Sequence, residues 1–271
     1  MSIEFESVSK AFGDGPLAVR EFSLHVPSHA SVAIVGSSGS GKSTLLRMVN
    51  RMVDPTAGRV LIDDVDVQTM EPVALRRSIG YVLQSGGLMP HRTVLDNVAT
   101  VPVLNGVSRR QARAAATELL ERVGLSAALG SRYPAMLSGG QQQRVGVARA
   151  LAADPNILLM DEPFGAVDPI VRRELQDELM RLQAELRKTI VFVTHDIDEA
   201  FRIGDEVVVL REGAGIAQRG TPAEILAAPA DAFVRDFIGA DRAARQLTTI
   251  RVGDATIAVD GDGRPVGTLR P

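Results

Sequence analysis

The chain of 271 residues contains no cysteine, and only three of its 30 basic residues are lysines, namely Lys10, Lys42 and Lys188. The lack of cysteine excludes a disulfide scaffold, a thiol nucleophile and a Cys-ligated metal. The net charge is -3 and no long block of one sign occurs, so we expect no nucleic-acid partner. Because arginine is used almost everywhere else, each retained lysine invites an explanation.

The sequence also lacks long apolar runs. None approaches the ~18 residues of a membrane span, and the first residues do not show the basic-then-apolar order of a signal peptide. We therefore expect a soluble chain that is cytoplasmic unless a partner carries it elsewhere. The length suits one large domain or two small ones, and a hydrophobic content of 45% is enough for a full core.

Apolar, β-branched runs alternate with helical patterns along most of the chain, which predicts a largely parallel α/β sheet. Residues 3–8 and 22–26 instead alternate polar with apolar residues, as strands with one buried face do. Short strand-like runs also occur at 60–62 and 79–83. The predicted buried strands are 31–35, 157–161, 189–194 and 207–210.

The stretch from about 93 to 153 has a helical pattern. Ser108 is a plausible N-cap and Gly124 a plausible stop for a helix over 109–122, and a second helix should begin near Ser138. Further helices are predicted at 170–187, 222–228 and 231–238. After Arg242 two alternating runs flank a turn signal at 260–263, which predicts a β-rich tail of about 30 residues, too short to fold alone.

A glycine-rich segment follows the first buried strand and precedes an apolar helix pattern. It reads Gly36-x-x-x-x-Gly41-Lys42-Ser43, the pattern of a P-loop. Glycines let backbone N–H groups turn toward phosphate oxygens, and the helix N-terminus adds a positive dipole. Lys42 would place a compact ammonium on the β- and γ-phosphates, where a planar Arg fork fits poorly. The alternative is a Gly/Ser turn that matches by chance. The predicted cradle for ATP comprises Gly36, Ser37, Ser38, Gly39, Ser40, Gly41, Lys42, Ser43 and Thr44.

Two carboxylates end the second buried strand, at Asp161 and Glu162. Asp161 is placed as a Mg²⁺-associated acid should be, together with the hydroxyl of Ser43. Glu162 would point elsewhere and could polarise an attacking water as a general base. The alternative is a strand that ends in solvated acids, which is common.

The segment Leu137-Ser-Gly-Gly-Gln-Gln-Gln-Arg144 resembles the signature motif of the ATP-binding-cassette (ABC) ATPases. Ser138 and the glycine backbone open a helix and offer a hydroxyl, N–H groups and a dipole to an anion. The chain already has one complete phosphate cradle, so two half-sites make sense if each completes the other across a dimer. The alternative is an ordinary Ser-capped helix. The nucleotide-binding residues implied here are Ser138, Gly139, Gly140 and Gln141.

Four further residues match the pattern of the same family. Phe12 resembles the aromatic that stacks on adenine, where the family more often has Tyr. Gln84 looks like the Q-loop glutamine that touches Mg²⁺ and the attacking water. Asp168 looks like the D-loop aspartate, and His195 like the switch histidine that contacts the γ-phosphate. The resemblance thus implies Glu162, His195, Gln84 and Lys42 as catalytic residues, and Ser43, Gln84 and Asp161 as metal ligands.

The resemblance covers about residues 1–240 and implies a P-loop NTPase cassette. Such a cassette has a RecA-like core, an N-terminal antiparallel β subdomain and a helical signature subdomain at about 93–153. It implies a homodimer that holds ATP and Mg²⁺ between the P-loop of one copy and the signature of the other. The tail at 241–271 would lie outside the cassette.

Longer stretches around these motifs, above all 220–225 through 236–242, resemble the ATPases of quaternary-amine importers. This implies an osmoprotectant such as glycine betaine, choline or carnitine, a separate membrane permease and an extracytoplasmic substrate-binding protein. The chain would sit peripherally at the cytoplasmic face of the membrane, where 85–93 receives the permease's coupling helix. Residues 257–269 resemble the closing strands of a CBS module, so the tail is at most a remnant of that osmotic sensor.

Four alternatives remain open. An importer of polar amino acids, nitrate or sulfonate shares most of the motifs. A soluble cassette ATPase acting on DNA or ribosomes would usually show two cassettes, long insertions or a strongly basic surface. A P-loop kinase or GTPase would lack the segment 137–141. A regulator with degenerate motifs is disfavoured because Lys42, Asp161, Glu162 and His195 are all intact.

Overall fold

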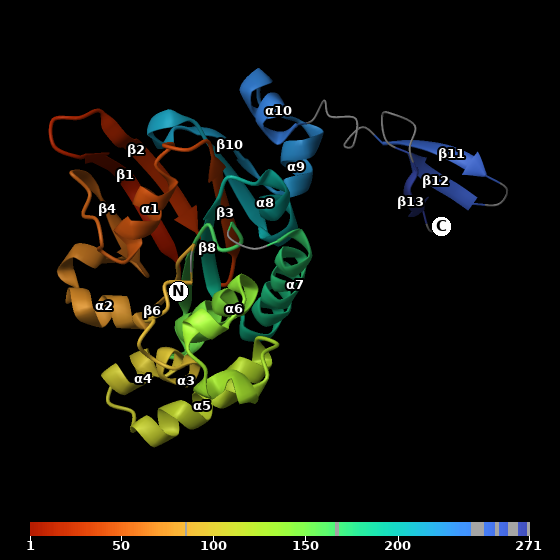
Figure 1. Ribbon diagram of the computed structural model, residues 1–271. Helices are drawn as coiled ribbons and strands as arrows, with labels where there is room; N and C mark the ends of the chain where they lie inside the picture. The colour runs from red at the N-terminus through yellow and green to blue at the C-terminus, as the bar shows by residue number, and fades with distance from the viewer. Residues whose placement is uncertain (85, 166–167, 240–246, 253–254, 260–264, 270–271) are drawn as a thin grey trace.

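The computed structural model describes residues 1–84, 86–165, 168–239, 247–252, 255–259 and 265–269 (Figure 1). The described elements form a central mixed sheet with helices against it, a smaller antiparallel sheet near the N-terminus, and a group of helices on one side.

The central sheet has six strands in the order β10-β9-β3-β8-β7-β6. All neighbouring pairs are parallel except β10 with β9. The strands β3, β8, β7 and β6 therefore end side by side, and the segments that follow them meet at one edge of the sheet. The strand bounds are β3 (Ser31–Gly36), β6 (Ile79–Val82), β7 (Ile157–Asp161), β8 (Thr189–Thr194), β9 (Glu206–Leu210) and β10 (Ile216–Gly220).

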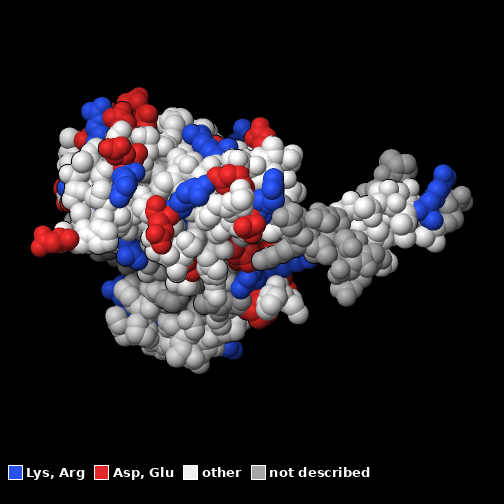
Figure 2. Space-filling view, turned by 90° about the horizontal axis from the view of Figure 1, so that it is seen from above, with Lys and Arg blue, Asp and Glu red and all other residues white. Residues whose placement is uncertain are grey.

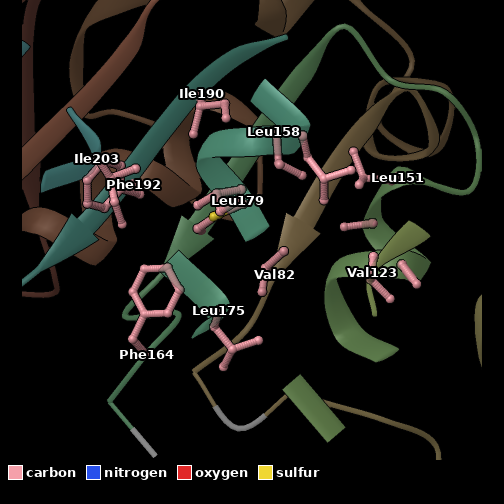
Figure 3. Close-up of a cluster of buried hydrophobic side chains, with 14 of the residues drawn as sticks. Val82, Val123, Leu151, Leu158, Phe164, Leu175, Leu179, Ile190, Phe192 and Ile203 are labelled. Atoms are coloured by element: carbon pink, nitrogen blue, oxygen red, sulfur yellow. The ribbon is translucent and has the colours of Figure 1, made fainter. Parts of the chain in front are cut away.

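The central strands are buried on both faces, as their continuous apolar runs require. Every residue of β3, β7 and β8 is buried, which fits strands covered by helices on both sides. On one side Phe192, Leu158 and Ile190 pack with Phe164, Leu175 and Leu179 (Figure 3). The other side packs against α1 (Lys42–Val49) and the antiparallel sheet. This rigid platform fixes where the strand ends point.

The smaller sheet has the order β2-β1-β4-β5 and is antiparallel throughout. Its strands are β1 (Ile3–Ala11), β2 (Leu17–Val26), β4 (Ala57–Ile62) and β5 (Val65–Asp66). Phe5 and Phe22 pack edge to face across β1 and β2 with ring centroids 5.3 Å apart. A 3-10 helix, η1 (Val67–Thr69), and α2 (Pro72–Ser78) lead from this sheet into β6. The two alternating runs predicted here are confirmed as strands.

The predicted helical stretch is confirmed, although it is broken into short pieces. Ser108 caps α5 by accepting a hydrogen bond from the Gln111 N–H at 3.3 Å. Gly124 follows the end of α5 with a φ of 73°, a conformation that favours glycine. The buried Asn97 holds the preceding loop by accepting from the Met89 N–H and donating back to its carbonyl. The elements are α3 (Val94–Val98), α4 (Thr100–Leu104), α5 (Arg109–Arg122), η2 (Ala127–Ser131), η3 (Pro134–Met136) and α6 (Gly139–Leu151).

The remaining helices follow the strands of the central sheet. Those predicted at 170–187, 222–228 and 231–238 are confirmed to within two residues, whereas α2, α8 and β10 were not predicted. The bounds are α7 (Pro169–Leu186), α8 (Ile197–Ile203), η4 (Glu212–Ala214), α9 (Pro222–Ala227) and α10 (Ala232–Ile238).

The described part of the tail contains three antiparallel strands in the order β11-β12-β13, with bounds Thr248–Val252, Ala255–Val259 and Pro265–Leu269. The turn predicted at 260–263 lies outside the described residues. Within the part of the chain that the structure describes, no helix combines the length and the apolar character needed to cross a bilayer.

Candidate nucleotide site

The P-loop joins β3 to α1 and forms one wall of a cavity of about 290 Å³. The cavity is also lined by Glu162 and Ala18. Gly39 and Gly41 have φ values of 82° and 93°, so the turn needs glycine at both positions. Gly36 was predicted to help turn the loop, but it ends the strand. It is needed there because a Cβ would lie 2.8 Å from the Leu210 carbonyl oxygen.

Lys42 lies at the base of this loop and is almost fully buried, with 6% of its surface exposed. Its ammonium donates hydrogen bonds to the Gly36 and Ser37 carbonyls, both at 2.8 Å. Burial lowers the pKa of the Lys42 amine, and the Glu162 and Asp161 carboxylates act in the opposite direction. The amine is thus held inside the predicted phosphate cradle.

Asp161 accepts hydrogen bonds from three side chains, two on α1 and one on β6. The Ser43 hydroxyl donates to Oδ1 at 2.8 Å. The Tyr81 hydroxyl donates to Oδ2 at 3.3 Å and an Arg47 Nη2 at 3.4 Å. Burial raises the pKa of Tyr81 to about 12, and the Asp161 charge adds to this, so the phenol remains a neutral donor.

Arg47 and Tyr81 were missed from the sequence. Arg47 lies four residues after Ser43 on α1, a spacing that puts both on one helix face, so this signal was available. Tyr81 reaches Asp161 because β6 pairs with β7, a neighbour relation that no local pattern gives.

The pairing of Ser43 with Asp161 suits Mg²⁺, which prefers oxygen ligands and is usually bound by one or two carboxylates plus substrate phosphates. Gln84, the third predicted metal ligand, does not join this pair. Its amide Nε2 donates instead to Oε2 of Glu162 at 3.0 Å.

Glu162 is the point where three predicted catalytic residues meet. Its Oε2 accepts from Gln84 and lies 3.2 Å from Nδ1 of His195. The Glu162 backbone has a φ of 45°, in the left-handed region, which costs a non-glycine residue roughly 1–2 kcal/mol. A hydrogen bond from the Glu162 N–H to the Val193 carbonyl at 3.0 Å holds this conformation. Strained backbone of this kind concentrates at functional sites.

The predicted signature residues begin α6. The Ser138 hydroxyl accepts from the Gln141 N–H at 3.3 Å, and the Gln141 side chain accepts from the Ser138 N–H at 3.0 Å, which completes a capping box. A Cβ on Gly140 would lie 2.3 Å from Val171, so α6 and α7 meet closely at this point. None of these residues lines the cavity of the chain's own P-loop, as far as the described residues show.

Two other predicted residues also lie apart from that cavity. Asp168 caps α7 by accepting from the Ile170 and Val171 N–H groups, both at 3.1 Å. Phe12 follows β1 and is 55% exposed, with the Lys10 ammonium 5.2 Å from its ring centroid. Lys10 also donates to the Asp54 carbonyl at 2.6 Å. Phe12 is therefore free to stack on a planar group.

The third lysine, Lys188, lies at the opposite end of the sheet strands. It is 9% exposed and forms an ion pair with Asp154 at 2.7 Å. This contact supports the start of β8 and has no link to the nucleotide site.

The chain is similar to known proteins of one family. Residues 19–165 match the family model described as ABC transporter. The carnitine transport ATP-binding protein OpuCA of Listeria monocytogenes is 50% identical over 240 residues, 89% of this chain and 60% of that protein. The osmoprotectant import ATP-binding protein OsmV of Salmonella typhimurium is 44% identical, over 99% of this chain and 70% of that protein.

Among solved structures, a dimeric bacterial ABC transporter cassette matches with a TM-score of 0.74 and 35% identity, over 81% of this chain and 98% of that one. The same cassette, solved after hydrolysis with ADP and Pi bound, also gives a TM-score of 0.74, at 33% identity and the same coverage.

Fold and site together define a P-loop ATP-binding cassette. The chain belongs to the ABC transporter family. It spans about 60% of the length of the OpuCA proteins that it matches.

Proposed function

We propose that the chain hydrolyses ATP to drive an ABC importer for a quaternary-amine osmoprotectant such as glycine betaine, choline or carnitine. The proposed cassette spans residues 1–240, with a helical subdomain at about 93–153 and the tail at 241–271 outside it. The convergence of Gln84 and His195 on one oxygen of Glu162, beside the P-loop cavity, carries the proposal of hydrolysis. The names of the relatives, which include carnitine and osmoprotectant transport, support the substrate class.

The proposed chemistry is the transfer of the γ-phosphoryl group of ATP to water. Lys42 neutralises charge on the phosphates, and Ser43 and Asp161 hold Mg²⁺, which supplies further charge neutralisation when bound. Glu162 accepts a proton from the attacking water, which Gln84 helps to orient, and His195 contacts the γ-phosphate. The bond between the γ-phosphorus and the oxygen that bridges it to the β-phosphate breaks, and the products are ADP and phosphate.

The substitution Glu162→Gln tests this role. It keeps the shape of the side chain but removes the basic oxygen, so ATP binding should persist while turnover falls by roughly 10²–10⁴-fold. Glu121→Gln, an exposed acid on α5, is the matched control. Turnover of Glu162→Gln that equals the control would refute the assigned base.

We further propose that two copies hold two ATP molecules, each between one P-loop and the partner copy's Ser138 and Gly140. The position of these residues outside their own P-loop cavity supports this arrangement. Ser138→Arg would place a bulky cation where the phosphates must enter, so ATP-driven dimerisation should be lost.

Ser108→Arg provides a matched control, because Ser108 caps α5 with the same 3.3 Å geometry. Both substitutions should cost about 1 kcal/mol of stability as lost caps. Light scattering with ATP, with each substitution in the Glu162→Gln background, would show whether Ser138→Arg loses dimerisation while Ser108→Arg keeps it. A Ser138→Arg protein that still dimerises would overturn the shared site.

The proposal includes a separate membrane permease and an extracytoplasmic substrate-binding protein, with the chain at the cytoplasmic face of the membrane. The segment 85–93 after Gln84, whose first residue lies outside the described residues, would meet the permease. A cavity of about 310 Å³, lined by His91, Arg92, Tyr133 and neighbours, supports this. Co-purification of the tagged chain with a permease tests the partner, and uptake of radiolabelled glycine betaine in a strain lacking the chain tests the substrate.

Uptake of amino acids or nitrate in place of betaine would favour one of the other importer classes. A soluble cassette acting on nucleic acid is disfavoured, because basic and acidic side chains are interspersed on the face shown in Figure 2, within the described residues. Failure to co-purify any permease would revive that alternative.

A further inference from the structure

The turn that follows Gln84 rests on the helix that begins at the signature. Arg149 of α6 donates from Nη1 to the Gly87 carbonyl at 2.6 Å and from Nη2 to the Gly86 carbonyl at 2.8 Å. Both glycines have positive φ values, of 71° and 55° for Gly86 and Gly87, so their carbonyls are turned toward the helix by a conformation that few other residues adopt.

The same face of α6 contacts this turn at two more positions, spaced by three residues. The Gln143 amide donates to the Leu83 carbonyl at 3.4 Å. A Cβ on Gly146 would lie 3.2 Å from the Gly86 carbonyl oxygen, so glycine permits the close approach of the two backbones. Gln143, Gly146 and Arg149 thus form one face that follows the backbone on both sides of Gln84.

Among the described residues, the Arg149 guanidinium donates to the two carbonyls of this turn and forms no ion pair with an acidic group. Burial lowers the pKa of the Arg149 guanidinium. Its planar fork matches two adjacent carbonyls in a way that a single ammonium does not. A half-buried cation placed on two loop carbonyls fixes the loop to the helix.

The two ends of this connection act at different nucleotides. Gln84 touches Glu162 at the chain's own P-loop, whereas Ser138 at the start of α6 faces the partner copy's ATP in the proposed dimer. A shift of Gln84 on nucleotide binding would be carried by the turn and Arg149 to α6, and hence to Ser138. Packed, hydrogen-bonded elements of this kind transmit coupling between sites.

We propose that Arg149 is a positioning residue that couples the two ATP sites of the dimer. This rests on the proposed function, because it requires the shared sites. Cooperative hydrolysis is the expected consequence, with a Hill coefficient for ATP above one and up to about two in a two-site dimer. Without the fork, only the linkage that ATP-driven dimerisation itself imposes should remain between the two sites.

The experiment measures ATP hydrolysis of the full chain against ATP concentration, under conditions where the Glu162→Gln protein dimerises. Arg149→Ala should lower the Hill coefficient toward one, leaving only the cooperativity that dimerisation itself imposes. Arg149→Lys keeps the charge but cannot span both carbonyls in the same plane, so an intermediate value is expected. The Arg149→Lys variant also keeps the test informative if the Arg149→Ala protein does not fold.

Arg144→Ala is the matched control. Arg144 lies on the same helix, its side chain is 14% exposed, and it also donates to a backbone carbonyl, that of Val123 at 3.2 Å. It also pairs with Glu174 at 3.1 Å, so its loss should lower stability at least as much as that of Arg149, while the Hill coefficient stays at the wild-type value.

The outcomes distinguish a failure of the shared-site dimer from a failure of the coupling role of Arg149. If Glu162→Gln does not dimerise with ATP, the shared-site dimer fails and the coupling fails with it. If it dimerises but the wild type is non-cooperative, or Arg149→Ala and Arg144→Ala have equal Hill coefficients, the coupling role alone is overturned.

Discussion

Two glycines of the P-loop should respond very differently to the same methyl group. Gly39 and Gly41 both have positive φ, of 82° and 93°. A Cβ on Gly39 meets no atom within 4 Å, whereas one on Gly41 would lie 2.6 Å from the Ala18 carbonyl oxygen and 3.3 Å from Ala214. The first substitution adds strain in the backbone only, and the second adds a clash with neighbouring backbone as well.

The free-energy difference follows from these contacts. An alanine in the left-handed region costs roughly 1–2 kcal/mol, and its smaller unfolded-state entropy returns about 0.4–1 kcal/mol. Gly39→Ala should therefore destabilise by about 1 kcal/mol. Overpacking adds about 1–3 kcal/mol for Gly41→Ala. With roughly 2–4 °C per kcal/mol for a chain of this size, Gly41→Ala should melt roughly 2–12 °C below Gly39→Ala.

Thermal melting of the nucleotide-free proteins measures this difference without involving catalysis. Equal melting temperatures for the two variants would refute the reasoning, because they would show that the backbone conformation alone sets the cost. A lower melting temperature for Gly39→Ala than for Gly41→Ala would contradict the packing around the loop.

Three further results are expected. Phe12→Ala should weaken ATP binding by roughly 5–150-fold through the loss of about 1–3 kcal/mol of stacking. Phe12→Tyr keeps the ring and should keep the affinity. An unchanged Kd for ATP in the alanine variant would show that Phe12 is not part of the nucleotide site. In a Tyr133→Phe protein Tyr81 is the sole tyrosine, and its ultraviolet absorbance should titrate at about 12. Because this folded pKa is raised from 10.0, Tyr81 contributes stability that is present below pH 10 and lost as the pH rises toward 12. The melting temperature of a Tyr81→Phe protein should therefore lack this fall between pH 10 and 12. A Tyr81 titration near 10 would contradict the burial of its hydroxyl. Deletion of 243–271 should leave the salt dependence of transport unchanged, and a lost salt response would instead give the tail a regulatory role.

The parts of the site that are continuous in sequence could be predicted, because their geometry is local. A buried strand that runs into Gly36–Ser43 places phosphate-binding N–H groups by itself, and Ser138 caps the helix that follows it directly. The family resemblance implied Glu162, His195 and Lys42 as one catalytic set, and the carboxyl ends of the parallel strands β3, β7 and β8 do lie at one sheet edge.

The unpredicted parts depend on pairings between distant elements. Tyr81 reaches Asp161 across 80 residues of sequence. Arg47 reaches it across 114 residues, although its spacing from Ser43 on α1 was a local signal. Arg149 lies five residues beyond the signature segment on the same helix, and only the packing of α6 on the turn after Gln84 shows which carbonyls it contacts. The edge strand β10 was missed because none of its residues is buried, so it carries no apolar pattern. The helix α8 is as short as the predicted α10 and was missed although Asp196 caps it.

The scarcity of lysine makes the protein's amine chemistry simple. Lys42 and Lys188 are buried, so the side-chain amine most open to acylating reagents is that of Lys10, next to the exposed ring of Phe12. A base stacked on that ring would shield the neighbouring amine. Acylation of Lys10, followed by mass spectrometry, would then report occupancy of the nucleotide site in the unmodified sequence, with no engineered label and almost no background from other lysines.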